Sequence, residues 1–117
     1  MRANPKRLHK LPISKNLYNI IMKYIKFTFD KRKAEINLAK HGVSFGEAKS
    51  VFADEFARVI FDDEHSEDEE RFIILGMSAR ARILVVAHCY REKDEVIRII
   101  SARKATARET KQYEELR

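Results

Sequence analysis

Residues 71–103 read RFIILGMSARARILVVAHCYREKDEVIRIISAR and contain three segments rich in isoleucine and valine. We expect strands over Arg71–Met77, Arg82–Arg91 and Glu95–Arg103, because β-branched residues favour extended backbone and short polar connections separate these segments. The upstream segment Arg58–Phe61 has the same character and predicts a fourth strand. Four successive strands with short links favour an antiparallel meander.

Capping signals predict two helices before this meander. Asp30 stands as an N-cap before a helix over residues 31–41, and Gly42 follows it as the glycine that ends a helix. Ser44 then caps a second helix, with Glu47 at the third position of a capping box.

The two ends of the chain complete the expected fold. Phe27 and Phe29 alternate with polar residues, which predicts a short strand over Lys26–Asp30. A polar helix is expected over Ala105–Leu116. Helices near both ends of a run of strands predict an α+β fold, a compact single domain with a four- to five-stranded antiparallel sheet, two N-terminal helices and one C-terminal helix.

Composition limits the class of protein. The 117 residues are enough for one domain, and 44% apolar with 36% charged residues fits neither a disordered chain nor a membrane protein. No apolar run approaches the ~20 residues of a membrane-spanning helix. The single cysteine, Cys89, excludes a disulfide within the chain. We therefore expect a soluble, cytoplasmic protein that does not contact a membrane.

The net charge of +6 comes from the N-terminal segment. Residues 1–26 carry seven basic groups and no acid, whereas residues 27–117 carry 17 basic groups and 18 acids. We expect residues 1–21 to be a basic extension with a short helix over Lys15–Ile21, and residues 22–117 to form the domain, with Met22 as a natural start. A basic arm that touches RNA or a partner is the alternative.

A second charge asymmetry lies inside the domain. Residues 62–70 contain seven acids and no base, and residues 71–111 contain ten bases and four acids. A basic face suits a polyanion, most often a nucleic acid. Arginines on the expected strands would form a phosphate clamp, since the guanidinium fork matches phosphate oxygens. The alternative is that each arginine pairs with a nearby carboxylate.

Other chemical signals are weak. His41 ends a helix, where the carbonyl dipoles explain it, and His88 lies in mid-strand as a half-buried residue would. No histidine or cysteine spacing resembles a metal site, and three glycines do not make a phosphate-binding loop. Cys89 is more typical of a core residue than of a nucleophile.

Several strings stand in a fixed order along the chain: FTFD at 27–30, KHGVSF at 40–45, ER at 70–71 and RIISAR at 98–103, followed by Glu109 and Tyr113. This arrangement resembles the BrnT toxin family over about residues 26–114. Phe29 stands where the family usually has tryptophan, and the segment before Met22 has no counterpart.

The resemblance implies a fold, a function and a partner. Proteins of this family are small ribonucleases of type II toxin–antitoxin systems with a fold similar to RelE toxins, and they cut RNA and arrest translation. A BrnA antitoxin with a ribbon-helix-helix DNA-binding part neutralises them, and the complex represses its own operon. RNA is then the substrate, DNA is contacted only through the antitoxin, and no cofactor is expected.

Metal-free RNA cleavage needs three actions from the protein: orienting the ribose 2′-hydroxyl, neutralising the crowded phosphate and protonating the leaving oxygen. Arginine stabilises charge but is no base. The expected catalytic residues are Arg71, Arg91, Arg103 and, as acid or base, His41. Lys40, His88 and a carboxylate such as Glu95 are alternative bases. The expected RNA-binding residues are Lys40, Arg82, Arg98 and Tyr113.

Two other functions are compatible with the sequence. One is a non-catalytic module that binds nucleic acid or an antitoxin. The other is a metal-dependent nuclease, with the acidic stretch at residues 62–70 holding Mg²⁺. A solvated connector explains that stretch as well.

Overall fold

The computed structural model describes residues 23–93 and 95–115. The predicted extension at residues 1–21, with its helix over Lys15–Ile21, lies outside the described residues. In chain order the elements are β1 (Lys26–Thr28), α3 (Lys31–His41), α4 (Phe45–Ser50), the 3-10 turn η1 (Val51–Ala53), β2 (Arg58–Phe61), the 3-10 turn η2 (Asp63–His65), β3 (Phe72–Met77), β4 (Ile83–Arg91), β5 (Val96–Lys104) and α5 (Ala107–Glu115).

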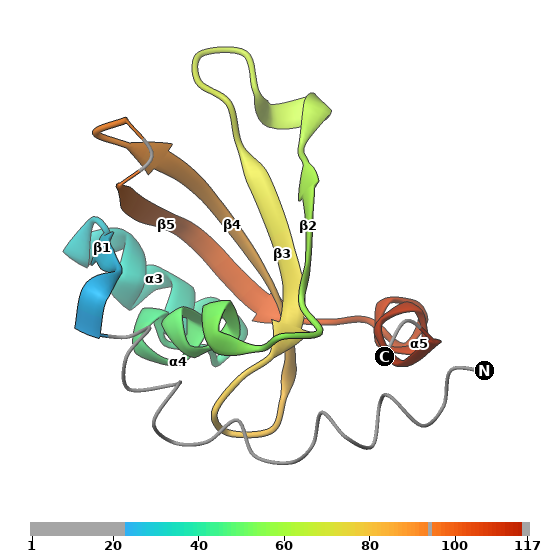
Figure 1. The fold of residues 1–117 in the computed structure, drawn as a ribbon. Helices are drawn as coiled ribbons and strands as arrows, with labels where there is room; N and C mark the ends of the chain where they lie inside the picture. The colour runs from blue at the N-terminus through green and yellow to red at the C-terminus, as the bar shows by residue number, and fades with distance from the viewer. Residues whose placement is uncertain (1–22, 94, 116–117) are drawn as a thin grey trace.

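The five strands form one twisted sheet in the order β1-β5-β4-β3-β2 (Figure 1). Strands β2 to β5 pair antiparallel with their chain neighbours, which confirms the predicted meander. The expectation of an antiparallel sheet throughout is wrong, because β1 pairs parallel with β5 through Phe27 and Ile97. Helices α3 and α4 connect β1 to the meander, and a connection of that length allows parallel pairing. The sheet is therefore mixed.

The predicted caps hold both helices in place. The Asp30 side chain accepts from the Lys33 amide at 3.0 Å, and Gly42 ends α3 with a φ of 70°. The Ser44 hydroxyl accepts from the Glu47 amide at 2.9 Å. The reciprocal half of the capping box is not made, since the Glu47 carboxylate binds Arg82 and Ser78 instead.

Helices α3 and α4 cover part of one face of the sheet (Figure 1). Asn37 of α3 fixes this packing, because its amide donates to the Ala102 carbonyl at 2.7 Å and accepts from the Ala102 amide at 3.1 Å. The buried core between helices and sheet consists of Val43, Phe45, Ala48, Val51, Ile74, Leu84, Val86, Ile99 and Ala102. The face of the sheet that carries α3 and α4 is called the helix-side face below.

The C-terminal helix α5 is anchored by Tyr113, which is 1% exposed. Its hydroxyl donates to the Asp54 carboxylate oxygen Oδ2 at 2.6 Å. Asp54 Oδ2 also accepts from the Met77 amide, at 2.7 Å. Asp54 therefore links the segment after η1, strand β3 and α5. Across the described ranges 23–93 and 95–115, no helix has the length and hydropathy to cross a membrane.

Candidate functional site

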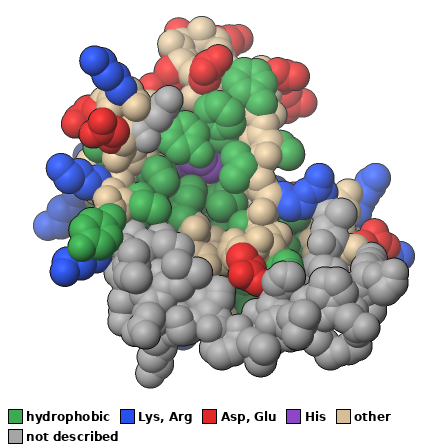
Figure 2. Space-filling view, viewed as in Figure 1, with side chains coloured by type: hydrophobic (Ala, Val, Ile, Leu, Met, Phe, Trp, Pro, Cys, Tyr) green, Lys and Arg blue, Asp and Glu red, His purple; other side chains and the backbone are tan. Residues whose placement is uncertain are grey.

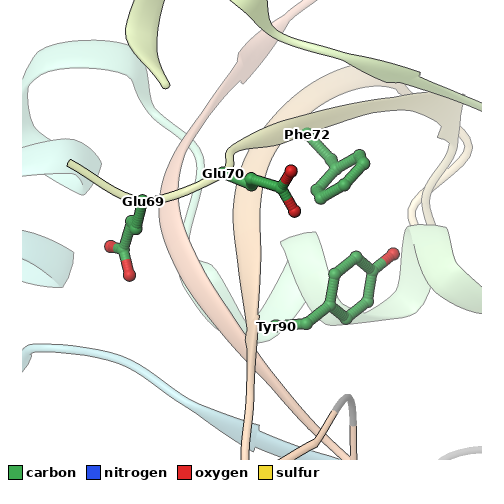
Figure 3. A pocket seen from close by; sticks show the side chains of 4 residues that line it. All are labelled: Glu69, Glu70, Phe72 and Tyr90. Atoms are coloured by element: carbon green, nitrogen blue, oxygen red, sulfur yellow. The ribbon is translucent and has the colours of Figure 1, made fainter. Parts of the chain in front are cut away.

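A pocket of about 460 Å³ opens on the helix-side face where α4 no longer covers the sheet. We call it the aromatic pocket; it is lined by Glu69, Glu70, Phe72 and Tyr90. Phe72 and Tyr90 belong to the neighbouring strands β3 and β4, and their ring centroids are 5.2 Å apart. Figure 3 shows the Glu70 carboxylate on the same side of the chain as both rings, with the Glu69 carboxylate turned away from them.

The surroundings of the pocket are apolar over the sheet and acidic at its end. Figure 2 shows hydrophobic side chains gathered over the exposed part of this face and acidic ones beyond them. Strand β2 adds three consecutive exposed apolar side chains, those of Val59, Ile60 and Phe61. The Phe61 ring packs against Phe72 at a centroid distance of 5.5 Å. The pocket is therefore continuous with an aromatic surface.

The buried His88 holds Tyr90 in place. Its Nδ1 lies 3.2 Å from the Val86 carbonyl oxygen, which can only accept, so Nδ1 carries the proton. Burial lowers the pKa of His88, so the ring is neutral and its Nε2 is an acceptor. The Tyr90 hydroxyl, 3.2 Å from Nε2, therefore donates to His88. Phe52 and Phe72 pack against the imidazole.

A second cavity of about 350 Å³ adjoins the first, because Glu69 lines both. We call it the loop hollow; its other lining residues are Glu64, His65, Glu67, Asp68 and Arg71. The Glu69 carboxylate pairs with the Arg91 guanidinium at 3.1 Å. A hydrogen bond with Cys89, and then the charge of Glu69, raise the pKa of Arg91, which keeps it charged. Glu69 is therefore the link between Arg71 and Arg91.

His65 is oriented by a carboxylate in this hollow. Its Nδ1 lies 3.0 and 3.2 Å from the two carboxylate oxygens of Asp62. The contact leaves the opposite ring nitrogen, Nε2, as the one that can meet a ligand. Within the described ranges, no three His, Cys, Asp or Glu side chains are grouped so as to hold a metal ion.

The three arginines of the expected catalytic set do not converge. Arg103 lies opposite Val85, whereas Arg91 lies six residues further along β4, about 20 Å away at ~3.3 Å per residue. Arg103 makes two hydrogen bonds to Glu109, at 2.8 and 3.0 Å, and this pairing lowers the pKa of Glu109 to about 2. Arg71 and Arg91 are related only through Glu69, which lines the loop hollow with Arg71 and pairs with Arg91, whereas Arg103 lies elsewhere, beside α5.

Two expected RNA-binding residues have structural partners. Arg82 pairs with the buried carboxylate of Glu47 and donates to the Gly42 carbonyl at 3.0 Å. Its hydrogen bond lowers the pKa of Glu47, so both groups are charged. Tyr113 is buried on Asp54. These contacts account for Arg82 and Tyr113 without RNA.

The remaining expected residues lie apart from the two cavities. Lys40 and His41 occupy the last turn of α3. Arg98 lies opposite Cys89, so the alternation of side chains places it on the face away from α3 and α4. None of the three has a side-chain ion pair within residues 23–93 and 95–115.

Of the residues that line the two cavities, only Arg71 was an expected site residue; His65, Glu69, Glu70, Phe72 and Tyr90 were among those that the sequence did not indicate. The sequence indicated only two roles for the acidic stretch at residues 62–70, a solvated connector or a magnesium site. The sequence held one signal for the two aromatic residues. Phe72 and Tyr90 fall on adjacent expected strands, and each is next to an arginine of the expected catalytic set. Their shared face depends on the register Phe72 to His88, which the sequence does not give.

The comparisons with known proteins agree with this fold. Residues 29–109 match the family described as the ribonuclease toxin BrnT of type II toxin–antitoxin systems. The chain belongs to the BrnT ribonuclease toxin family. No curated protein matches the sequence.

A solved BrnT structure supports this membership. The fold is similar to the crystal structure of the Brucella abortus ribonuclease toxin BrnT, with a TM-score of 0.55 and 25% identity. The alignment covers 70% of this chain and 97% of that chain. The predicted family is confirmed, and this BrnT-family chain is a ribonuclease toxin of a type II toxin–antitoxin system. The likeness to RelE toxins stays a prediction.

Proposed function

We propose that this BrnT-family toxin is an endoribonuclease that cuts RNA without a metal ion, by attack of a ribose 2′-hydroxyl on the adjacent phosphate. The observation that carries the proposal is the Glu69–Arg91 ion pair, with Arg71 in the same hollow as Glu69. A phosphate that binds Arg91 replaces Glu69 as its partner. The carboxylate is then available beside the bound nucleotide.

The groups around Glu69 supply each action that the reaction needs. Glu69 takes the proton of the 2′-hydroxyl, whose oxygen forms a bond to phosphorus. Arg71 and Arg91 stabilise the charge on the phosphate oxygens. The bond from phosphorus to the 5′-oxygen breaks, and His65 in its imidazolium form protonates that oxygen. The products are a 2′,3′-cyclic phosphate and a 5′-hydroxyl end.

His41, Arg103 and the RNA-binding set of Lys40, Arg82, Arg98 and Tyr113 stay predictions. The ion pairs of Arg82 and Arg103 favour structural roles for these two residues. Arg98 is the member best placed to contact RNA that also reaches Arg91, because it lies opposite Cys89, two residues from Arg91 on β4.

We test the proposal with Arg71→Ala, Arg91→Ala and Glu69→Gln in the full-length protein. Each change should lower cleavage of a single-stranded RNA at least 100-fold in excess EDTA, since each removes a group that acts on the reacting atoms. Wild-type fragments should end in 2′,3′-cyclic phosphate. Circular dichroism checks that each variant is folded.

Arg108→Ala is the matched control, because Arg108 is an exposed arginine of α5. It should cut RNA as the wild type does. Full activity of a folded Arg71→Ala or Glu69→Gln protein contradicts this site. Wild-type activity that EDTA abolishes and Mg²⁺ restores favours the metal-dependent alternative instead.

We also propose that a BrnA-like ribbon-helix-helix antitoxin neutralises the toxin in the cytoplasm, where translated RNA is found, and that DNA is contacted only through this partner. The test expresses residues 22–117, which begin at Met22, with and without the adjacent gene. Growth arrest and loss of intact RNA that the adjacent gene reverses would support the proposal. A non-catalytic binding module would leave total RNA intact.

A further inference from the structure

The aromatic pocket has a composition that selects its ligand. Two aromatic rings and two carboxylates line it, and Arg91 neutralises one of these carboxylates, that of Glu69. Within the described residues, the second carboxylate, that of Glu70, has no ion pair. It lies beside the Phe72 ring (Figure 3). The pocket therefore offers an acceptor next to flat apolar surfaces.

The hydrogen bond between His88 and Tyr90 strengthens this selectivity. Tyr90 directs its proton to His88 Nε2, so the hydroxyl donates into the protein. The polar groups that the pocket offers to a ligand are then its two carboxylates, which accept hydrogen bonds, so the ligand must donate them. A flat ligand with adjacent N–H donors fits both the rings and the Glu70 carboxylate.

Among the nucleobases, guanine presents this pattern. Its N1–H and its N2 amino group lie side by side on one edge, so a carboxylate can accept both in parallel. Uracil offers a single N–H, and cytosine and adenine each offer one amino group beside an acceptor nitrogen. Base stacking on aromatic side chains is a common way to bind single-stranded RNA.

We propose that the aromatic pocket binds a guanine base of single-stranded RNA, with Phe72 and Tyr90 as apolar walls and Glu70 as the acceptor for N1–H and N2–H. The subsite rests on the proposed function, because Glu69 joins the pocket to the arginines assigned to the phosphate. It deepens that function by giving the ribonuclease a base preference next to the cut.

The test measures binding of RNA that cannot be cut. Fluorescein-labelled tetranucleotides of sequence UUXU are made with 2′-O-methyl riboses, which removes the attacking hydroxyl. Fluorescence anisotropy then gives the affinity of the full chain with X as guanine, inosine, adenine, cytosine or uracil. We expect guanine to bind about tenfold more tightly than uracil, adenine or cytosine, and inosine, which lacks the N2 amino group, to fall between.

Two variants assign the preference to the pocket. Glu70→Gln replaces one acceptor oxygen by a donor, so the ratio of guanine to uracil affinity should fall to about one. Glu67→Gln is the matched control, because Glu67 lies in the same acidic stretch and does not line the aromatic pocket. Its ratio should equal that of the wild type.

Three results would overturn the subsite: equal binding of all five oligonucleotides, a guanine preference that survives in folded Glu70→Gln, or displacement of UUGU by millimolar arginine amide, which would identify the pocket as a cation site. The assay does not depend on cleavage. Guanine preference without any nuclease activity would remove the proposed function alone, and cleavage without guanine preference would remove the subsite alone.

Discussion

The ion pair between Arg103 and Glu109 should give the protein a pH-dependent stability. The pKa of Glu109 falls from 4.5 to about 2 in the folded state, first because of the hydrogen bond from Arg103. A carboxyl with a depressed pKa stabilises the fold above its unfolded pKa, and this contribution is lost as pH falls from about 4.5 towards 2. Since the Arg103 side chain is 41% exposed, solvent limits the effect to about 1 kcal/mol.

We therefore predict that Glu109→Gln is less stable than the wild type by about 1 kcal/mol at pH 6 and equally stable near pH 2. Urea unfolding followed by circular dichroism at several pH values measures this. Glu114→Gln, an exposed change on the same helix, should parallel the wild type at every pH. An unchanged pH profile for Glu109→Gln would mean that the pair contributes no net stability.

Single residues show where sequence reasoning stops. The caps Asp30, Gly42 and Ser44 were predictable because they act on backbone within a few residues. Glu47 was assigned to a capping box, yet its carboxylate binds Arg82, 35 positions away. An arginine on a strand predicts a phosphate contact or an ion pair equally well, and only the register decides which carboxylate is near.

Strand β3 shows how closely the elements pack. A Cβ on Gly76 would lie 2.8 Å from the Ala57 Cβ and 2.9 Å from Val51 Cγ1. Neither atom is the far end of a flexible side chain, so the backbone around η1 or β3 must shift. We predict that Gly76→Ala destabilises the protein by about 1–3 kcal/mol and lowers its Tm by about 5–15 °C.

Gly46→Ala is the contrasting substitution on α4. Its added Cβ would meet only the Ser44 hydroxyl, at an ordinary 3.7 Å, and alanine favours a helix over glycine by up to about 1 kcal/mol. Thermal unfolding should therefore show an equal or higher Tm. A Gly76→Ala protein as stable as Gly46→Ala would indicate that β3 and η1 are not in close contact.

At the scale of elements, the strands and helices were largely predictable and their pairing was not. Observed bounds coincide with the expected ones at about half of the ends and differ by one or two residues at the others. The turns between strands carry Ala81, Glu92 and Lys93 at positive φ, where glycine or asparagine would have marked them. The irregularity between Ala87 and His88 shifts the register of β5. Alternation along β4 places His88 and Tyr90 on one face, as observed, but the side chains of β3 and β5 that lie beside Tyr90 needed coordinates.

The local charge at the proposed RNA site is opposite in sign to the net charge of the molecule. The chain carries +6, yet seven acids lie in residues 62–70, and several of them line the loop hollow where we place the phosphate. An RNA that reaches Arg71 and Arg91 must pass these carboxylates. Long-range attraction to the basic chain and local repulsion at the site therefore act against each other.

Neutralising two acids of the loop hollow should show whether RNA affinity depends on the charge at the site or on the net charge of the protein. The double variant Glu67→Gln with Asp68→Asn changes two exposed residues of the hollow. We predict that it binds 2′-O-methyl UUGU about threefold to tenfold more tightly at 0.05 M salt. The gain should nearly vanish at 0.5 M salt, where the Debye length is about 4 Å.

The matched double variant is Glu114→Gln with Glu115→Gln, which alters the net charge by the same +2 on exposed residues of α5. If net charge governed RNA binding, both doubles would bind more tightly by the same factor. A gain confined to the loop double would place the phosphate within about 14 Å of Glu67 and Asp68, which is the Debye length at the 0.05 M salt of the assay. Equal gains would move the RNA away from the loop hollow, and with it the roles given to Glu69 and His65.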